Sequence, residues 1–173
     1  MLLTPGSFYE SGGYRERGEK TKFFAGQILE DYILASGELL VAMTEQAAGL
    51  VGSPLLVPES SRFLHNQRLG LVTGKAHVRW CNEFFFHVFN LRRVRQAIQS
   101  SASGVKVRHT SPGKIGAIQV AFPNSVAEQS KIASQLADLS TECEHLEFIY
   151  RQKLAALDEL KKSLLQSAFN GDL

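Results

Sequence analysis

The chain has 173 residues, of which 44% are hydrophobic and 21% charged, and its net charge is +2. This composition fits one globular domain with an extension. No apolar run approaches the roughly 20 residues that cross a bilayer, and the opening MLLTPGSFYE lacks a signal-peptide pattern. The two cysteines, Cys81 and Cys143, form no metal or redox spacing, so we expect a reduced, cytoplasmic protein.

The positive charge is concentrated in one stretch of the chain. Residues 62–114 carry 10 Lys/Arg and a single acid, Glu83, which gives a net charge of +9. The flanking stretches are acidic, at −4 for residues 1–61 and −3 for residues 115–173. A basic block in a nearly neutral protein is typical of a surface that binds nucleic acid, but a solvated basic face has the same composition.

The first 124 residues predict a small α/β or α+β domain. Short apolar runs bounded by Gly and Pro predict strands over 38–43, 49–57 and 64–72, in an antiparallel or mixed sheet. A single helix is expected over 82–99, with Asn82 as N-cap and the phenylalanines 84–86 in the core. A basic loop over 105–114 then leads to a last strand over 117–122.

Residues 125–173 predict one long helix. Ser125 and Glu128 form a capping box, and the sequence continues without Pro or Gly as far as Asn170. Its a and d positions contain one charged residue, Lys153, and are otherwise Ile132, Leu136, Leu139, Cys143, Leu146, Tyr150, Leu157, Leu160 and Leu164. We therefore expect a coiled coil with a second helix. Folding back onto the domain fits less well, because the helix would be roughly 65 Å long.

The sequence contains no motif for catalysis. We find no GxxxxGK[ST] or GxGxxG phosphate-binding motif, no NPP[YF] or DPPY motif of adenine methyltransferases, and no nuclease pattern. A zinc set of His77, Cys81 and His87 would require a fourth ligand from His65 or His109, so ordinary structural roles are the better interpretation. We expect no metal, no cofactor and no catalytic centre.

Several stretches, in order along the chain, resemble the specificity subunits of type I restriction–modification enzymes. They are LLTPGSFYESGGY (2–14), DYILASGELLVAMTEQAAGLVGS (31–53), HNQRLGLV (65–72), VRHTSPGKIGAIQVAFP (107–123) and AEQSKIASQL (127–136). The ending YRQKLAALDELKKSLLQSAFNGDL (150–173) is similar to the family's C-terminal sequence. The chain departs from the family in having one recognition domain instead of two, and in lacking the family's usual opening strand and Gly-rich loop.

This resemblance implies a half-subunit: a target-recognition domain over 1–124, and a helix over 125–173 that acts as a spacer and dimerisation region. Such subunits read the two halves of a split DNA sequence and hold two modification (methyltransferase) subunits, which recruit restriction subunits. The expected partners are therefore double-stranded DNA, modification subunits, restriction subunits through them, and a second half-subunit or second copy of the chain. The alternative is a coiled-coil adaptor whose remnant domain no longer reads DNA.

Two kinds of DNA contact are expected within the basic block. Amide side chains bond to adenine and Arg to guanine, which makes Asn66, Gln67 and Arg68 candidates for base contacts. The same residues could instead hold the fold or touch the methyltransferase. Phosphate contacts, which position a protein without reading sequence, are expected from Arg92, Arg93, Arg95, Lys106, Arg108 and His109.

Overall fold

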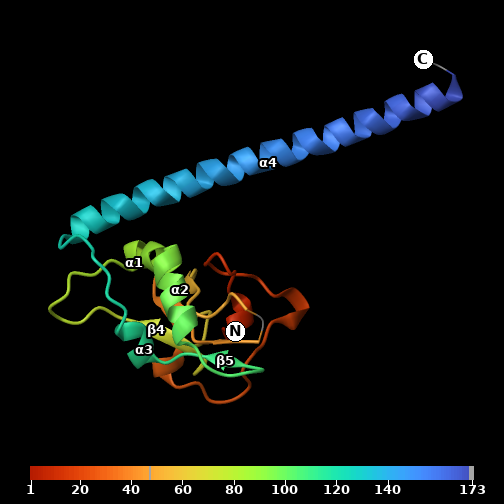
Figure 1. Cartoon of the computed structure of the whole chain (residues 1–173). Helices are drawn as coiled ribbons and strands as arrows, with labels where there is room; N and C mark the ends of the chain where they lie inside the picture. The colour runs from red at the N-terminus through yellow and green to blue at the C-terminus, as the bar shows by residue number, and fades with distance from the viewer. Residues whose placement is uncertain (47, 172–173) are drawn as a thin grey trace. The chain divides into compact units, whose positions relative to one another are not determined.

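The computed structural model describes residues 1–46 and 48–171 (Figure 1). The chain divides into two compact units, Met1–Ala133 and the chain from Ser134 on. Its elements in chain order are three short 3-10 helices (Pro5–Ser7, Gly18–Lys20, Glu30–Tyr32), β1 (Leu39–Ala42), β2 (Thr44–Glu45), β3 (Pro54–Leu56), β4 (Leu69–Val72), α1 (Asn82–Asn90), α2 (Arg92–Ser101), β5 (Arg108–His109), α3 (Pro112–Gly116) and α4 (Val126–Asn170). The expected α+β domain followed by a long helix is confirmed.

The main sheet is antiparallel, with the strand order β3-β1-β4. Leu39 of β1 lies between Leu56 of β3 and Val72 of β4. A second sheet pairs β2 with β5, also antiparallel. Among the described residues, parallel pairing is limited to one isolated bridge between Leu2 and Leu64. The predicted strands over 49–57 and 64–72 are shorter than expected, because turns occupy their first halves.

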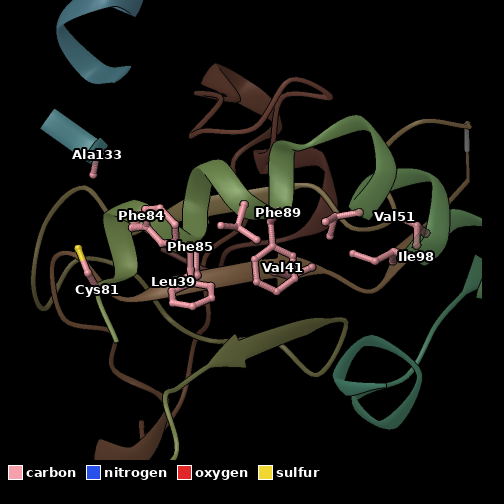
Figure 2. Packing of buried hydrophobic residues seen from close by; sticks show 11 residues of the cluster. Leu39, Val41, Val51, Cys81, Phe84, Phe85, Phe89, Ile98 and Ala133 are labelled. Atoms are coloured by element: carbon pink, nitrogen blue, oxygen red, sulfur yellow. The ribbon is translucent and has the colours of Figure 1, made fainter. Parts of the chain in front are cut away.

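The central strand β1 is buried on both faces, which explains why it is apolar at every position. Leu39 and Val41 face α1 and α2, where they pack with Phe85 and Phe89 (Figure 2). Leu40 and Ala42 point to the other side, into a cluster formed with the N-terminal segment. Phe84 and Phe85 are buried in the core, as expected, with Phe86 packed against it, and the ring of Trp80 stacks on Phe85 at 3.5 Å.

The helix expected over 82–99 is two helices, so this prediction was wrong. Leu91 leaves the helical conformation (φ −58°, ψ 130°) and separates α1 from α2. The N-cap of α1 is Cys81. The side chain of Asn82 instead accepts from Trp80 Nε1 (2.7 Å) and donates to the carbonyl of Gly37 (2.9 Å). Because of this break, Arg92, Arg93 and Arg95 lie at the start of α2 and not near the end of one long helix.

The first two turns of α4 belong to the first compact unit. Gln129 is fully buried there and donates from Nε2 to the carbonyls of Arg79 (3.0 Å) and Pro123 (2.8 Å). Ile132 and Ala133 pack against the core cluster. Ile132, expected in the coiled-coil stripe, therefore contributes to the domain. The expected boundary after residue 124 falls before these anchoring residues.

The strand expected over 117–122 does not form. Residues 118–122 run without regular structure after α3. Their side chains nevertheless alternate between half-buried (118, 120, 122) and exposed (119, 121), as in a strand. No strand within the described residues pairs with this segment, so the side-chain alternation of a strand occurs here without its hydrogen bonds.

Candidate nucleic-acid interface

Two basic segments meet on either side of Met43. The carbonyl of Arg68 accepts from the Met43 amide (3.0 Å), and the Met43 carbonyl accepts from Thr110 (2.9 Å). The next residue, Thr44, pairs with His109 in the small sheet. The turn at 65–68 and the loop that ends at β5 are thus neighbours, although about 40 residues separate them in the sequence.

The loop over 103–109 presents its tip to solvent. Ser103 and His109 close it with reciprocal backbone hydrogen bonds of 3.0 and 2.9 Å. Gly104 has a φ of +118°, and a Cβ there would lie 2.0 Å from the Val107 carbonyl oxygen, so this turn requires glycine. Lys106 and His109 are exposed. Their exposure makes them available for contact with a polyanion.

Arg108 lies in the same loop but has a different role. Its guanidinium forms a 2.8 Å ion pair with Glu45 and donates to the Gln99 carbonyl at 2.6 Å. The Glu45 side chain is only 1% exposed and also accepts from the amides of Gly49 (3.0 Å) and Val51 (2.8 Å). Because a buried carboxylate requires such partners, Arg108 contributes to holding the fold, and its phosphate contact stays a prediction.

Arg95 also joins parts of the fold, and its phosphate contact stays a prediction. Its guanidinium donates to the carbonyls of Glu10 (3.0 Å) and Gly49, joining α2 to two loops. Burial lowers the pKa of Arg95, and the carboxylates of Glu45 and Glu10 partly oppose this shift. A guanidinium remains charged even so. Its second terminal nitrogen is buried without a partner among the described residues.

Arg92 and Arg93 are exposed in the first turn of α2. Cations oppose the helix dipole at this end, so their placement does not stabilise the helix. The two side chains and the helix N-terminus all attract anions. They lie one helix length, about 15 Å at 1.5 Å per residue, from the end of α2 where Ser101 meets Thr110 at 3.1 Å.

In the turn at 65–68, Asn66 differs from its neighbours. Its Oδ1 accepts from the amide of Arg68 at 3.0 Å, a local bond that shapes the turn. The side chains of Gln67 and Arg68 are exposed and form no hydrogen bond within the described residues. The nine predicted DNA-binding residues therefore separate into three structural ones (Asn66, Arg95, Arg108) and six exposed ones (Gln67, Arg68, Arg92, Arg93, Lys106, His109).

Three further polar residues of this domain, Gln129, Lys114 and Lys75, were not predicted from the sequence. Gln129 looked like a surface residue of the long helix, and only its fit against Arg79 and Pro123 identifies it as an anchor. Lys114 donates to the Ser101 carbonyl at 2.7 Å and so caps the C-terminal end of α2. Lys75 is exposed between β4 and α1 and adds a further cation to the basic block, where its charge alone could have indicated it.

The second unit carries an exposed apolar stripe. Its leucines and Tyr150 are 38–62% exposed, and Cys143 is an exposed free thiol. The stripe consists of Leu136, Leu139, Cys143, Leu146, Tyr150, Leu157, Leu160 and Leu164. The helix is also charged asymmetrically. Residues 134–149 contain four acids and no Lys/Arg, whereas residues 150–170 contain four Lys/Arg and two acids.

Neither a metal site nor a membrane span is found in the described part of the chain. Residues 1–46 and 48–171 contain no group of three or more His, Cys, Asp or Glu side chains that could hold a metal ion. Cys81, considered above for zinc, donates to Glu83 at 3.1 Å. None of the described helices is long and apolar enough to cross a membrane.

Comparison with known proteins shows a likeness in fold to a solved structure. No protein-family model matches the sequence, and no curated protein matches it. Among solved structures, the chain is similar to the S subunit of a type I restriction–modification system from M. genitalium, with a TM-score of 0.50 and 16% identity. The likeness covers 83% of this chain and 36% of that one. The chain therefore has the fold of a type I specificity subunit and spans about a third of its length.

Proposed function

We propose that this chain is a DNA-recognition half-subunit of a type I restriction–modification enzyme, without a catalytic centre of its own. The observation that carries the proposal is the exposed basic surface of the turn at 65–68 and the loop over 103–109, which meet beside Met43 on a specificity-subunit fold. In this proposal the recognition domain supplies sequence preference, and a modification subunit supplies the methyl transfer.

The six exposed residues have separate roles in this proposal. Gln67 and Arg68 carry the side-chain types that discriminate bases in the major groove. Lys106, His109, Arg92 and Arg93 contact phosphates along about 15 Å of the domain surface. Since DNA carries one charge per ~1.7 Å of axis, several phosphates lie within that span.

The α4 stripe pairs with a second copy of the chain in antiparallel orientation. A stripe of this length would leave many leucines in water in a monomer. Parallel pairing would place the acidic residues 134–149 of two copies side by side. Antiparallel pairing places them against the basic residues 150–170 of the other copy, so the charges favour this orientation.

One register pairs every a and d position from Leu136 to Leu160 with another of these positions. In an antiparallel pair each a position faces a d position of the other copy, and the residue numbers of every facing pair have the same sum. For the pairs given next, this places the centre of the register at Phe148. The four pairs, written with the residue of the other copy second, are Leu136–Leu160, Leu139–Leu157, Cys143–Lys153 and Leu146–Tyr150. The charged residue thus meets the small thiol, and all other pairs are apolar.

The test is a DNA titration of the chain with and without a modification subunit, at two salt concentrations. We expect affinity that falls steeply with salt, and methylation of a defined sequence in cells that carry both proteins. The variant Arg92→Ala with Arg93→Ala weakens binding to all sequences alike, whereas Gln67→Ala or Arg68→Ala changes the preferred sequence. Binding by the double variant as tight as that of the parent would contradict the assignment of this face.

A second function is favoured by one observation, the unpaired segment 118–122. A domain that lacks a strand could assemble through α4 without reading DNA, as a coiled-coil adaptor. This alternative predicts a dimer that binds modification subunit but has the same weak affinity for every DNA sequence.

A further inference from the structure

The last turns of α4 carry more apolar surface than the stripe accounts for. Leu164, Leu165 and Phe169 are 49%, 50% and 88% exposed. At about 100° per residue, Leu164, Ala168, Leu165 and Phe169 follow one another over about 140° of the helix circumference. The a and d positions of a two-stranded coil form a narrower seam. An apolar face of this width fits the surface of a folded domain better than it fits a single helix.

These turns lie too far along the helix to reach their own domain. α4 runs without a break from Val126 to Asn170 (Figure 1). Measured along this helix at ~1.5 Å per residue, Leu164 is about 46 Å from Ala133, where the first compact unit ends. A domain of that length has a radius of gyration of only about 14 Å. The surface that covers the apolar end therefore comes from a second molecule.

The antiparallel register brings the end of one helix to the domain of the other copy. Beyond the pair Leu136–Leu160, the next positions that face each other are Ile132 and, from the second copy, Leu164. Ile132 already packs against the core of its own domain. Gln129, the a position before it, is buried in hydrogen bonds to two backbone carbonyls. The seam between the helices therefore stops at Leu136, and the turns after Leu160 of the other copy meet the domain instead.

The domain has apolar side chains at the place where that end arrives. Val126, in the first turn of α4, is 41% exposed. Phe122, Pro123 and Ile132 are half-buried, and Gln129 joins the start of the helix to the Pro123 carbonyl at 2.8 Å. Covering these side chains with the apolar end of a second α4 removes apolar surface of both copies from water.

We propose that residues 164–169 of α4 dock on the recognition domain of the second copy, at the surface formed by Phe122, Pro123, Val126 and Ile132. Each domain is then held by the start of its own α4 and by the end of the other one, so that its orientation on the coil is fixed at two places. The inference rests on the antiparallel dimer of the proposed function and adds a second interface to that dimer.

Photo-cross-linking of the full chain tests the contact. The photoreactive amino acid p-benzoylphenylalanine replaces Phe169, a gel separates covalent dimers from cross-links within one chain, and mass spectrometry identifies the attached peptide. We expect covalent dimers in which the probe is attached to residues 120–133 of the other copy. The control carries the same probe in place of Phe148, at the centre of the coil, and should not attach to residues 120–133.

A second measurement keeps natural side chains. Leu165→Ser with Phe169→Ser leaves the stripe unchanged, so light scattering should still report dimers, while hydrogen–deuterium exchange of residues 129–136 should become at least about threefold faster. The matched control, Phe148→Ser with Ala155→Ser, should exchange as the parent does.

The two measurements separate this inference from the dimer on which it rests. A parent chain that is monomeric would contradict the antiparallel dimer itself. Dimers in which the probe at Phe169 attaches only within its own chain or only to residues after 134 would overturn the docking proposal and leave the dimer standing. Unchanged exchange in the Leu165→Ser, Phe169→Ser dimer would do the same.

Discussion

Two cations in one loop, Lys106 and Arg108, have opposite roles. Lys106→Met should leave stability unchanged and reduce the salt dependence of DNA binding by about one phosphate contact, because its ammonium is exposed. Arg108→Met should lower the free energy of unfolding by about 1.5–3 kcal/mol, because it removes a charged partner of the buried Glu45. Urea unfolding and DNA titration of the two variants measure both effects. A stable Arg108→Met chain that loses DNA affinity would reverse the assignment.

His87 makes the stability of the domain depend on pH. Burial lowers the pKa of His87 from the model-peptide value of 6.5, so the folded state favours the neutral imidazole. The unfolded chain therefore binds a proton more readily, and the contribution of His87 is complete above about pH 6.5 and is lost as the pH falls below it. The thermal midpoint should decrease between pH 7 and 5, and decrease less in His87→Gln. The exposed His109→Gln serves as the control and should follow the parent.

At the scale of elements, α4 should associate through one face only. Leu139→Asp with Leu157→Asp places charges within the stripe and should give monomers, because each Asp would be buried against leucine. Thr141→Asp with Ala155→Asp adds the same charge to the opposite face and should leave the dimer intact. Light scattering that reports dimers for both double variants would show that the copies meet elsewhere.

The orientation of the two helices can be tested with the free thiol of Cys143. In the register centred on Phe148, Cys143 faces Lys153 of the other copy, so Lys153→Cys should give disulfide-linked dimers on mild oxidation. The parent chain should not, since its two Cys143 thiols lie apart. Cys143→Ser with Lys153→Cys is the matched control and should remain uncrosslinked. Efficient cross-linking of the parent would indicate parallel helices.

The elements differ in how far the sequence could predict them. β1 and α4 follow from local patterns, an apolar run and an unbroken heptad stripe, which act within the element itself. The break at Leu91 has no such pattern, because leucine continues the helical spacing on both sides. The segment expected as a strand over 117–122 has alternating burial in the structure, but a strand also requires a neighbour, which local sequence cannot supply.

At the scale of the whole molecule, the sequence shows the basic block as a concentration of positive charge. It does not show which of these cations hold the fold and which are exposed. Arg95 and Arg108 have the same chemistry as Arg92 and Arg93. What separates them is distance from partners far along the chain, such as Glu45, which is 63 positions from Arg108. Long-range contacts of this kind decide which cations remain free for a ligand.

The last prediction concerns the distance between two recognition domains. Each domain joins the N-terminal end of its helix, so antiparallel pairing places the two domains at opposite ends of the coil, related by a two-fold axis. Such a dimer reads an inverted repeat with an unspecified spacer, because symmetric proteins meet DNA symmetrically. The length of the helix then sets the length of the spacer.

Insertion of one heptad between Leu146 and Leu160, with leucine at its two stripe positions, should lengthen the coil by about 10 Å at ~1.5 Å per residue. At roughly 3.4 Å per base pair this adds about three base pairs to the spacer, if the coil lies along the DNA axis. The half-site sequences should stay the same, because residues 1–124 are unchanged. A two-residue insertion is the control and should abolish dimers, since at 3.6 residues per turn it rotates the rest of the stripe by about 200° to the opposite face of the helix. Methylation mapping in cells with a modification subunit measures both features. An unchanged spacer would show that α4 does not set the distance, and a changed half-site would show that α4 contacts bases.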